Sequence, residues 1–444
     1  MRFPNLLATR RGRLAAFFLL YFTEGIPAGF TGTAIATQMR RQGLSPAVIG
    51  TFIGALYLPW AIKWAFGPVV DVLASDRWGR RRGWILLTQG MMVVMLLAAA
   101  PVDFRTHLGL FTALILVLNV FAATQDVAID ALAVNTLRGD ERGLANGLMF
   151  AGNYLGVAVG GAGVLLLTPV IGFRSTFFFV AGAIALVTLL VPVPLRESPG
   201  LPRPPRTGPA FGAIGREMAR FAHDAGKAFV GSRAAFVAIF LALLPMGAYA
   251  LSLALQSNLA VELGLSDSQI GLLGICSTAL SAAFCVLGGW LSDRFGRRRT
   301  LALFIAGTTL PTFGMAMAMH RFGWILPISP TAPDRPPVPA DLVALFWALT
   351  LAYAVFQGLM YGVGTAIYMD VTTPAVAGTQ FTAYMALCNL VYSYSSSWQG
   401  HALTRWGYPV TLTLDGAFGL VSILLLPFMG RPRPAPGPAA PDGQ

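Results

Sequence analysis

The chain has 444 residues, of which 55% are hydrophobic and only 11% are charged. Soluble domains carry about 25% charged residues, so this composition excludes an ordinary soluble protein and indicates a surface that largely faces lipid. The net charge of +12 does not indicate nucleic-acid binding, because the basic residues stand in short clusters between long apolar runs.

The apolar runs predict an all-α membrane protein with twelve transmembrane helices, since a bilayer core requires roughly 20 apolar residues per helix. The first run follows a basic segment as in a signal peptide, but no cleavage site follows it, so we interpret it as an uncleaved first helix. The twelve runs lie near residues 14–36, 46–72, 83–101, 108–135, 143–169, 174–194, 234–257, 267–290, 300–319, 343–370, 378–402 and 407–429.

The distribution of Lys and Arg predicts the orientation of these helices. Most of the 31 basic residues fall into one alternate set of connecting segments, and such segments face the cytoplasm. We therefore predict that both termini are cytoplasmic in the inner (plasma) membrane of a bacterium. The basic segments are 2–13, 77–82, 138–142, 196–233, 294–299 and 431–433.

A Pro-rich, basic linker at 197–233 predicts a division into two six-helix bundles, 1–196 and 234–430. We expect one short amphipathic helix of the linker to lie on the membrane surface. The tail, 431–444, is disordered by composition.

An internal repeat supports this division. The motif DRWGRRR (Asp76 to Arg82) follows the second predicted helix, and DRFGRRR (Asp293 to Arg299) follows the eighth. Because each is the second helix of its set of six, motif and topology repeat together, which predicts two pseudo-symmetric bundles.

These loops carry a family resemblance. The segment from Gly289 to Arg298 resembles the GxxxDRxGRR loop of the major facilitator superfamily, and the first copy has a longer loop after Asp71. That longer loop, AATQDVAID (Ala122 to Asp130) and ERGLANG (Glu141 to Gly147) resemble the branch with AmpG-type muropeptide permeases and acetyl-CoA transporters. Siderophore permeases of the RhtX/FptX type are similar in these stretches. The resemblance implies the major facilitator fold and alternating-access transport.

Four charged side chains lie inside predicted helices of the first half, where each costs about 2.5–3.5 kcal/mol on insertion scales. They are Glu24, Lys63, Asp126 and Asp130. At about 1.5 Å of rise per residue, all four lie at similar depth near the bilayer midplane. Burial disfavours an ionised carboxylate and a nearby ammonium favours it, so one acid could change protonation as the site alternates. We predict proton coupling here; the alternative is a static Lys63–acid pair that holds helices together.

The second half shows no comparable charge inside its predicted helices before Asp370, at the end of the tenth. Its polar side chains are neutral or aromatic, which suits hydrogen bonding and ring stacking with a solute. Helices one, four, seven and ten line the cavity in the family that the chain resembles; for any single side chain the alternative is ordinary helix packing. The candidate substrate contacts are Tyr249, Gln256, Gln357, Tyr361, Asn153 and Gln125.

The two DRxGRR loops predict a gate. Asp71 and Asp293 end helices, where each can pair with nearby arginines or cap an adjacent helix. We expect such contacts to close the cytoplasmic side while the site faces outward; the alternative is plain positive-inside anchoring. The gating residues are Asp71, Arg77, Gly79, Arg80, Arg81, Asp293, Arg294, Gly296, Arg297 and Arg298.

The predicted function is a proton-coupled secondary transporter that imports a polar organic solute such as a muropeptide. Alternatives are a siderophore or acyl-CoA-type solute, efflux, or a membrane sensor that transports nothing. The sequence has no P-loop or nucleophile elbow, and its three cysteines have no metal-binding spacing. We therefore expect no enzyme activity, cofactor or metal. The expected partners are a small solute, protons and lipid, with no nucleic acid, and we expect a monomer.

Overall fold

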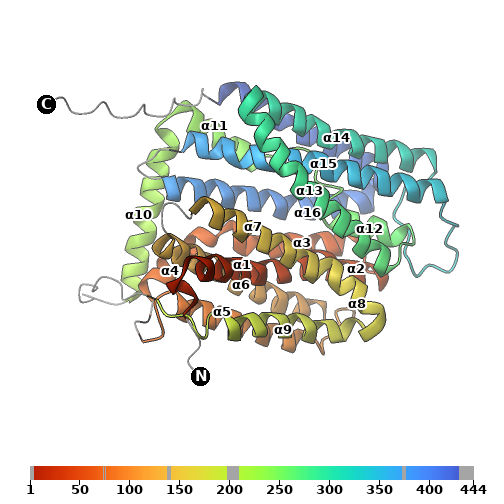
Figure 1. Cartoon of the computed structure of the whole chain (residues 1–444). Helices are drawn as coiled ribbons and strands as arrows, with labels where there is room; N and C mark the ends of the chain where they lie inside the picture. Colours follow the sequence, from red (N-terminus) through yellow and green to blue (C-terminus); the bar gives the residue numbers. More distant parts are fainter. Residues whose placement is uncertain are drawn as a thin grey trace.

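The computed structural model describes residues 5–73, 75, 77–137, 142–197, 210–372 and 377–429. Within these ranges the regular structure is helical, apart from one isolated bridge between Ser75 and Gly79. Most helices run side by side along one axis, and α10 crosses their ends (Figure 1). This is the architecture of a membrane-spanning helix bundle.

Ten stretches of the described chain are long and apolar enough to span a membrane. Several combine more than one element: α1 (Arg10–Gly29) continues through a π-helical stretch into α2 (Ala36–Arg41), and α3 (Pro46–Ala61) continues into α4 (Phe66–Val72). The other elements in them are α5 (Arg82–Ala99), α6 (Leu108–Thr136), α7 (Arg142–Ala158), α8 (Val164–Ile171), α9 (Phe173–Leu190), α13 (Asp267–Phe295), α14 (Arg297–Arg321), α15 (Ala340–Val371) and α16 (Ala377–Leu420).

Two features relate these ten stretches to the twelve predicted from the sequence. The last stretch is 49 residues long and breaks at Gly407, whose φ of 78° is not helical, so it contains the eleventh and twelfth predicted helices. The seventh predicted helix is interrupted. It consists of α11 (Arg233–Leu243) and α12 (Ala254–Glu262), which are joined by ten non-helical residues.

Glycines allow some helix backbones to touch. A Cβ atom placed on Gly156 of α7 would lie 2.3 Å from the carbonyl oxygen of Phe22, and one placed on Gly25 would lie 2.1 Å from that of Asn153. A similar contact joins Gly50 of α3 to the backbone of α16. Small residues at helix interfaces permit this close approach in membranes, and here they set the spacing between the helices that carry the polar residues described below.

The linker forms a longer helix than expected. The sequence predicted one short amphipathic helix between the halves, whereas α10 (Ala210–Val230) has 21 residues. It contacts α4, α11 and α16 and lies across the ends of the spanning helices (Figure 1). The predicted disordered tail, 431–444, lies outside the described residues.

Candidate functional site

The four predicted intramembrane charges meet in one cluster, hereafter the charge cluster: Glu24, Lys63, Asp126 and Asp130. Lys63 Nζ lies 2.9 Å from Asp126 Oδ2, and Lys63 also lies near the Trp60 ring, 5.8 Å from its centroid. Asp126 is only 4% exposed. The cluster sets three carboxyl groups against one ammonium, so full ionisation would leave buried negative charge without a counter-ion.

Glu24 lies beside this ion pair. Its carboxyl interacts electrostatically with Asp126, Lys63 and Asp130. Asn153 Nδ2 donates a hydrogen bond to Glu24 Oε1 at 3.2 Å, whereas Glu24 Oε2 is buried without a donor among the described residues. A buried carboxylate oxygen without a hydrogen-bond donor is costly while the group is charged. The environment of Glu24 Oε2 therefore favours the protonated, neutral form of this carboxyl group.

Asp130 has a different environment although it lies one turn from Asp126. The Tyr21 hydroxyl donates a hydrogen bond to Asp130 Oδ1, and the Asp130 residue is exposed in this structure. Asp126 and Asp130 therefore differ in packing: protein covers Asp126 almost completely, whereas part of the Asp130 residue is not covered by protein.

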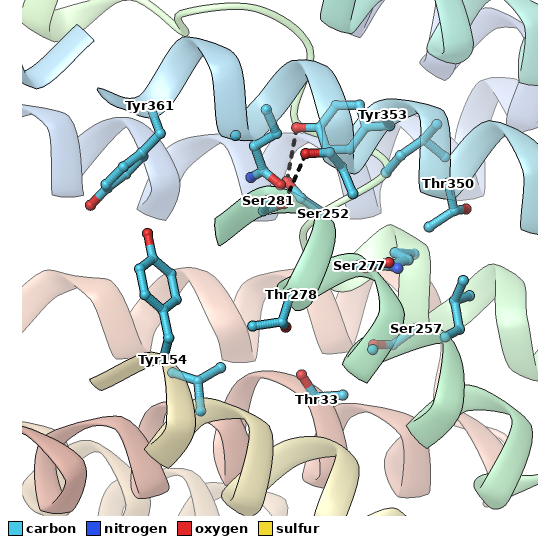
Figure 2. Close-up of a pocket in the computed structure, with 18 of the residues that line it drawn as sticks. Thr33, Tyr154, Ser252, Ser257, Ser277, Thr278, Ser281, Thr350, Tyr353 and Tyr361 are labelled. Carbon is cyan, nitrogen blue, oxygen red and sulfur yellow. Dashed lines mark hydrogen bonds between the residues drawn. The ribbon is translucent and has the colours of Figure 1, made fainter. Parts of the chain in front are cut away.

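A cavity of about 330 Å³ lies between the two halves of the chain. Figure 2 shows the Tyr154 and Tyr361 hydroxyls facing one another across it, with Ser252 and Tyr353 on one wall. Among its lining residues there is no Asp, Glu, Lys or Arg. The lining instead offers hydroxyl groups, amides and aromatic rings, which suit a polar solute that is held by hydrogen bonds and stacking.

Four of the six predicted substrate contacts line this cavity: Asn153, Gln256, Gln357 and Tyr361. Tyr249 does not line it. Its ring is 4% exposed and packs against the Tyr392 ring, which does line the cavity, with centroids 5.0 Å apart.

Gln125 is also placed away from the cavity. It is fully buried and donates a hydrogen bond to Thr23 Oγ1, which also accepts one from Gln89. Its position supports the structural alternative, in which a polar side chain joins neighbouring helices.

The cavity is closed at the end where α2 meets α12. Arg40 pairs with Glu262, and Arg41 pairs with Asp267, which also accepts a hydrogen bond from Gln38. Both pairs connect the first half to the second. They are the ion pairs between halves that the described residues contain, so the polar closure is concentrated at this end.

The predicted gating loops lie toward the end crossed by α10, and each contains an ion pair within its own half (Figure 1). Asp71 pairs with Arg81, and the backbone N–H groups of Arg81 and Arg82 donate to the carboxylate of Glu197. In the second half, Arg297 pairs with Asp370.

The other predicted gating residues divide into three groups. Gly79 and Gly296 have φ angles of 87° and 90° at the turns. Arg77 and Arg294 are exposed, and Arg80 and Arg298 are partly buried. The Asp293 side chain lies outside what the structure describes.

The sequence analysis did not single out one buried acid of the second half. Asp415, which follows Asp370 in the chain, lies within the twelfth predicted helix and is 3% exposed. It accepts hydrogen bonds from the N–H groups of Tyr249 and Ala250 at 2.8 and 2.9 Å. The sequence did contain the signal that identifies Asp415. An acid within an apolar run is the same signal that identified Glu24.

Comparison with known proteins identifies the family. A model of the Major Facilitator Superfamily matches residues 15–250 and 235–444, so the chain belongs to this superfamily. The anhydromuropeptide permease of Escherichia coli (strain K12) is 25% identical over 430 residues, which cover 93% of this chain and 79% of that protein. The "Putative transporter AmpG 4" of Rickettsia conorii is 28% identical over 184 residues, 40% of this chain and 44% of that one.

Solved structures agree on the fold. A D-xylose-proton symporter superimposes with a TM-score of 0.68 at 14% identity, over 93% of this chain and 96% of its own. The nucleoside transporter NupG gives 0.64 at 13% identity, over 94% and 98%. The chain is therefore a multi-pass membrane protein, a secondary transporter and not an enzyme, as the sequence predicted.

Proposed function

We propose that the chain is a proton-coupled importer of a polar organic solute, of which an anhydromuropeptide is the first candidate. The observation that carries the proposal is the hydrogen bond between Asn153 and Glu24. Asn153 lines the cavity, and Glu24 belongs to the charge cluster. The Asn153 side chain thus contacts both the cavity, which would hold the solute, and the charge cluster, which would exchange the proton.

This contact gives a mechanism. When Glu24 is protonated, the cluster retains two carboxylates against Lys63, and Asn153 meets a neutral carboxyl. Loss of that proton adds a buried negative charge, which favours a conformation in which water reaches the cluster. A solute that binds Asn153 and its neighbours biases the same equilibrium, so proton and solute movements become coupled.

The cavity lining supports an uncharged or weakly charged solute over an acyl-CoA. Coenzyme A carries several phosphate charges, and the lining has no Lys or Arg to meet them. Lys63 is already paired with Asp126. The name of the Escherichia coli relative, an anhydromuropeptide permease, supplies the candidate solute.

The orientation that we propose places the α10 end in the cytoplasm. The basic residues of α10 and of both DRxGRR loops lie toward that end, and cytoplasmic segments are rich in Lys and Arg. The α2–α12 end, which the Arg40–Glu262 and Arg41–Asp267 pairs join, then faces outward.

The test is uptake of a radiolabelled anhydromuropeptide into proteoliposomes with an imposed pH gradient, acid outside. We expect the gradient to accelerate uptake and a protonophore to abolish the acceleration. Glu24→Gln, Asp126→Asn and Asp130→Asn should lose the acceleration yet still exchange solute across the membrane at equal pH. Full gradient-driven uptake by all three variants would contradict proton coupling. Uptake driven only by the opposite gradient would instead indicate efflux.

A further inference from the structure

The interrupted helix between α11 and α12 has an unusual set of backbone partners. Residues 244–253 are not helical, and Gly247 has a φ of 83°. In a membrane each backbone N–H and C=O of such a segment must find a partner inside the protein. Broken helices of transporters use this arrangement where they border a binding cavity.

Side chains from three other helices supply these partners. Thr308 of α14 accepts a hydrogen bond from Ala248 N at 3.1 Å, and Tyr353 of α15 donates one to Ala248 O at 2.7 Å. Asp415 of α16 accepts from two successive N–H groups, those of Tyr249 and Ala250. Asp415 is therefore the side chain that binds two backbone groups of the segment, whereas Thr308 and Tyr353 each bind one.

Asp415 is itself held in place. Its second oxygen, Oδ1, accepts a hydrogen bond from Gln399 Nε2 at 2.7 Å, and both side chains are almost fully buried. Gln399 Oε1 has no partner among the described residues. The carboxylate thus has three donors and a fixed orientation, and hydrogen bonds to a charged acceptor are among the stronger ones in proteins.

Segment 244–253 is connected to the cavity through two of its side chains, Ser252 and Tyr249. Ser252 lines the cavity and lies 3.1 Å from the Tyr353 hydroxyl (Figure 2). The Tyr249 ring packs on Tyr392, whose ring in turn packs on Tyr57 of α3 with centroids 5.4 Å apart. A shift of the segment would therefore move both a cavity wall and a stack of rings that joins the two halves.

We propose that Asp415 is the positioning residue that fixes segment 244–253 and thereby sets the wall that the solute meets. This proposal depends on the proposed function in one respect, namely that the solute binds in the cavity. Its consequence is that substitutions at Asp415, which does not line the cavity, change the apparent affinity for the solute.

The variants separate hydrogen-bond geometry from charge. Asp415→Leu removes all three acceptor bonds at similar volume. Asp415→Asn keeps an oxygen for the two backbone donors, and its amide can donate to Gln399 Oε1 after the Gln399 amide turns over. Ser422→Ala is the matched control, because Ser422 is fully buried on the same transmembrane segment and its hydroxyl donates to Gly419 O, one turn earlier in the chain, with no other partner among the described residues.

Two measurements decide the outcome. The first is KM and kcat for anhydromuropeptide uptake by proteoliposomes. The second is the rate at which N-ethylmaleimide labels Ser252→Cys in purified protein whose native cysteines are replaced by serine. We expect Asp415→Leu to raise KM about tenfold or more with a smaller change in kcat and to change the labelling rate severalfold. Asp415→Asn and Ser422→Ala should stay within about twofold of wild type.

Wild-type KM and labelling in Asp415→Leu would overturn the proposal, and so would equal impairment of Asp415→Asn and Asp415→Leu. If Asp415→Leu does not reach the membrane, Thr308→Val takes its place. It should change the labelling rate about threefold because one backbone donor loses its acceptor, and no change would overturn the proposal. If the wild type does not take up the muropeptide, the proposed function fails, while the labelling comparison still decides the role of Asp415.

Discussion

Arg40 of α2 and Glu262 of α12 form an ion pair whose side chains are 3% and 0% exposed, and the pair joins the two halves of the chain at one end of the cavity. Arg40 also donates to Ile328 O at 2.8 Å, and Ile328 N donates to Glu262 Oε2 at 3.1 Å. The Arg40 guanidinium and the Glu262 carboxylate therefore lose their ion pair when this end opens.

This relationship predicts the effect of removing one partner. Glu262→Leu leaves Arg40 buried without a counter-ion, which costs about 3–5 kcal/mol, so the α2–α12 end should open. We expect Thr37→Cys, at a buried position of α2, to react with a membrane-impermeant maleimide at least tenfold faster in the Glu262→Leu background.

The double variant Arg40→Leu with Glu262→Leu serves as the control, since it removes both charges and should recover much of the slow labelling. Arg41→Gln should have a smaller effect, because the Arg41 side chain is 30% exposed. Labelling that is equally slow in all variants would show that the pair does not hold this end closed.

The Lys63–Asp126 pair predicts a result that separates proton coupling from a static bridge. If the pair only holds helices together, neutralising both residues in Lys63→Met with Asp126→Asn should restore much of the activity that each single variant loses. If the groups couple a proton, gradient-driven uptake should remain at least about tenfold below wild type in the double variant. The measurement is initial uptake with and without a pH gradient. Recovery by the double variant would favour the static bridge.

The sequence singles out the four members of the charge cluster because lipid makes each buried charge conspicuous. Helix rise placed Glu24, Lys63, Asp126 and Asp130 at similar depth, and the structure brings these side chains near one another, with Lys63 paired to Asp126. Length and hydropathy predicted twelve helices, and ten stretches of the described chain are long and apolar enough to span a membrane. The break at 244–253 was not visible in the sequence. In the sequence, an interrupted apolar helix looks like a continuous one. The side chain that binds the exposed backbone of the break, Asp415, lies far along the chain.

Two of the candidate substrate contacts, Gln125 and Tyr249, lie away from the cavity, in contacts between helices. The sequence places a side chain on a helix but does not show which side of the helix faces a cavity. The closing pair Arg40–Glu262 was missed because its residues lie 222 positions apart. Nothing local in the sequence distinguishes Arg40 from an anchoring arginine.

The glycines between α1 and α7 predict a packing requirement. Gly156 lies so close to α1 that a Cβ would come within 2.3 Å of Phe22 O, whereas Gly147 on the same helix has no atom within 4 Å of its Cβ position. Gly156→Ala should destabilise the protein by about 1–3 kcal/mol and weaken uptake, because α7 also carries Asn153. Gly147→Ala should have little effect. Thermal unfolding of both variants in detergent is the measurement; equal melting temperatures would contradict close packing.

The two DRxGRR loops predict a conformational effect with little effect on stability. Asp71 is 53% exposed and its pair with Arg81 lies within the first half, so Asp71→Asn should lower stability by less than about 1 kcal/mol. If the loops gate the cytoplasmic side, both Asp71→Asn and Asp293→Asn should nevertheless shift the distribution between inward-facing and outward-facing states. Cysteine labelling from the cytoplasmic side in inverted vesicles reports that shift. Glu217→Gln on α10 is the control, because among the described residues the ion-pair partner of Glu217 is Arg220 of the same helix, at 3.5 Å. If Asp71→Asn and Asp293→Asn label like this control, the loops anchor the chain by charge alone.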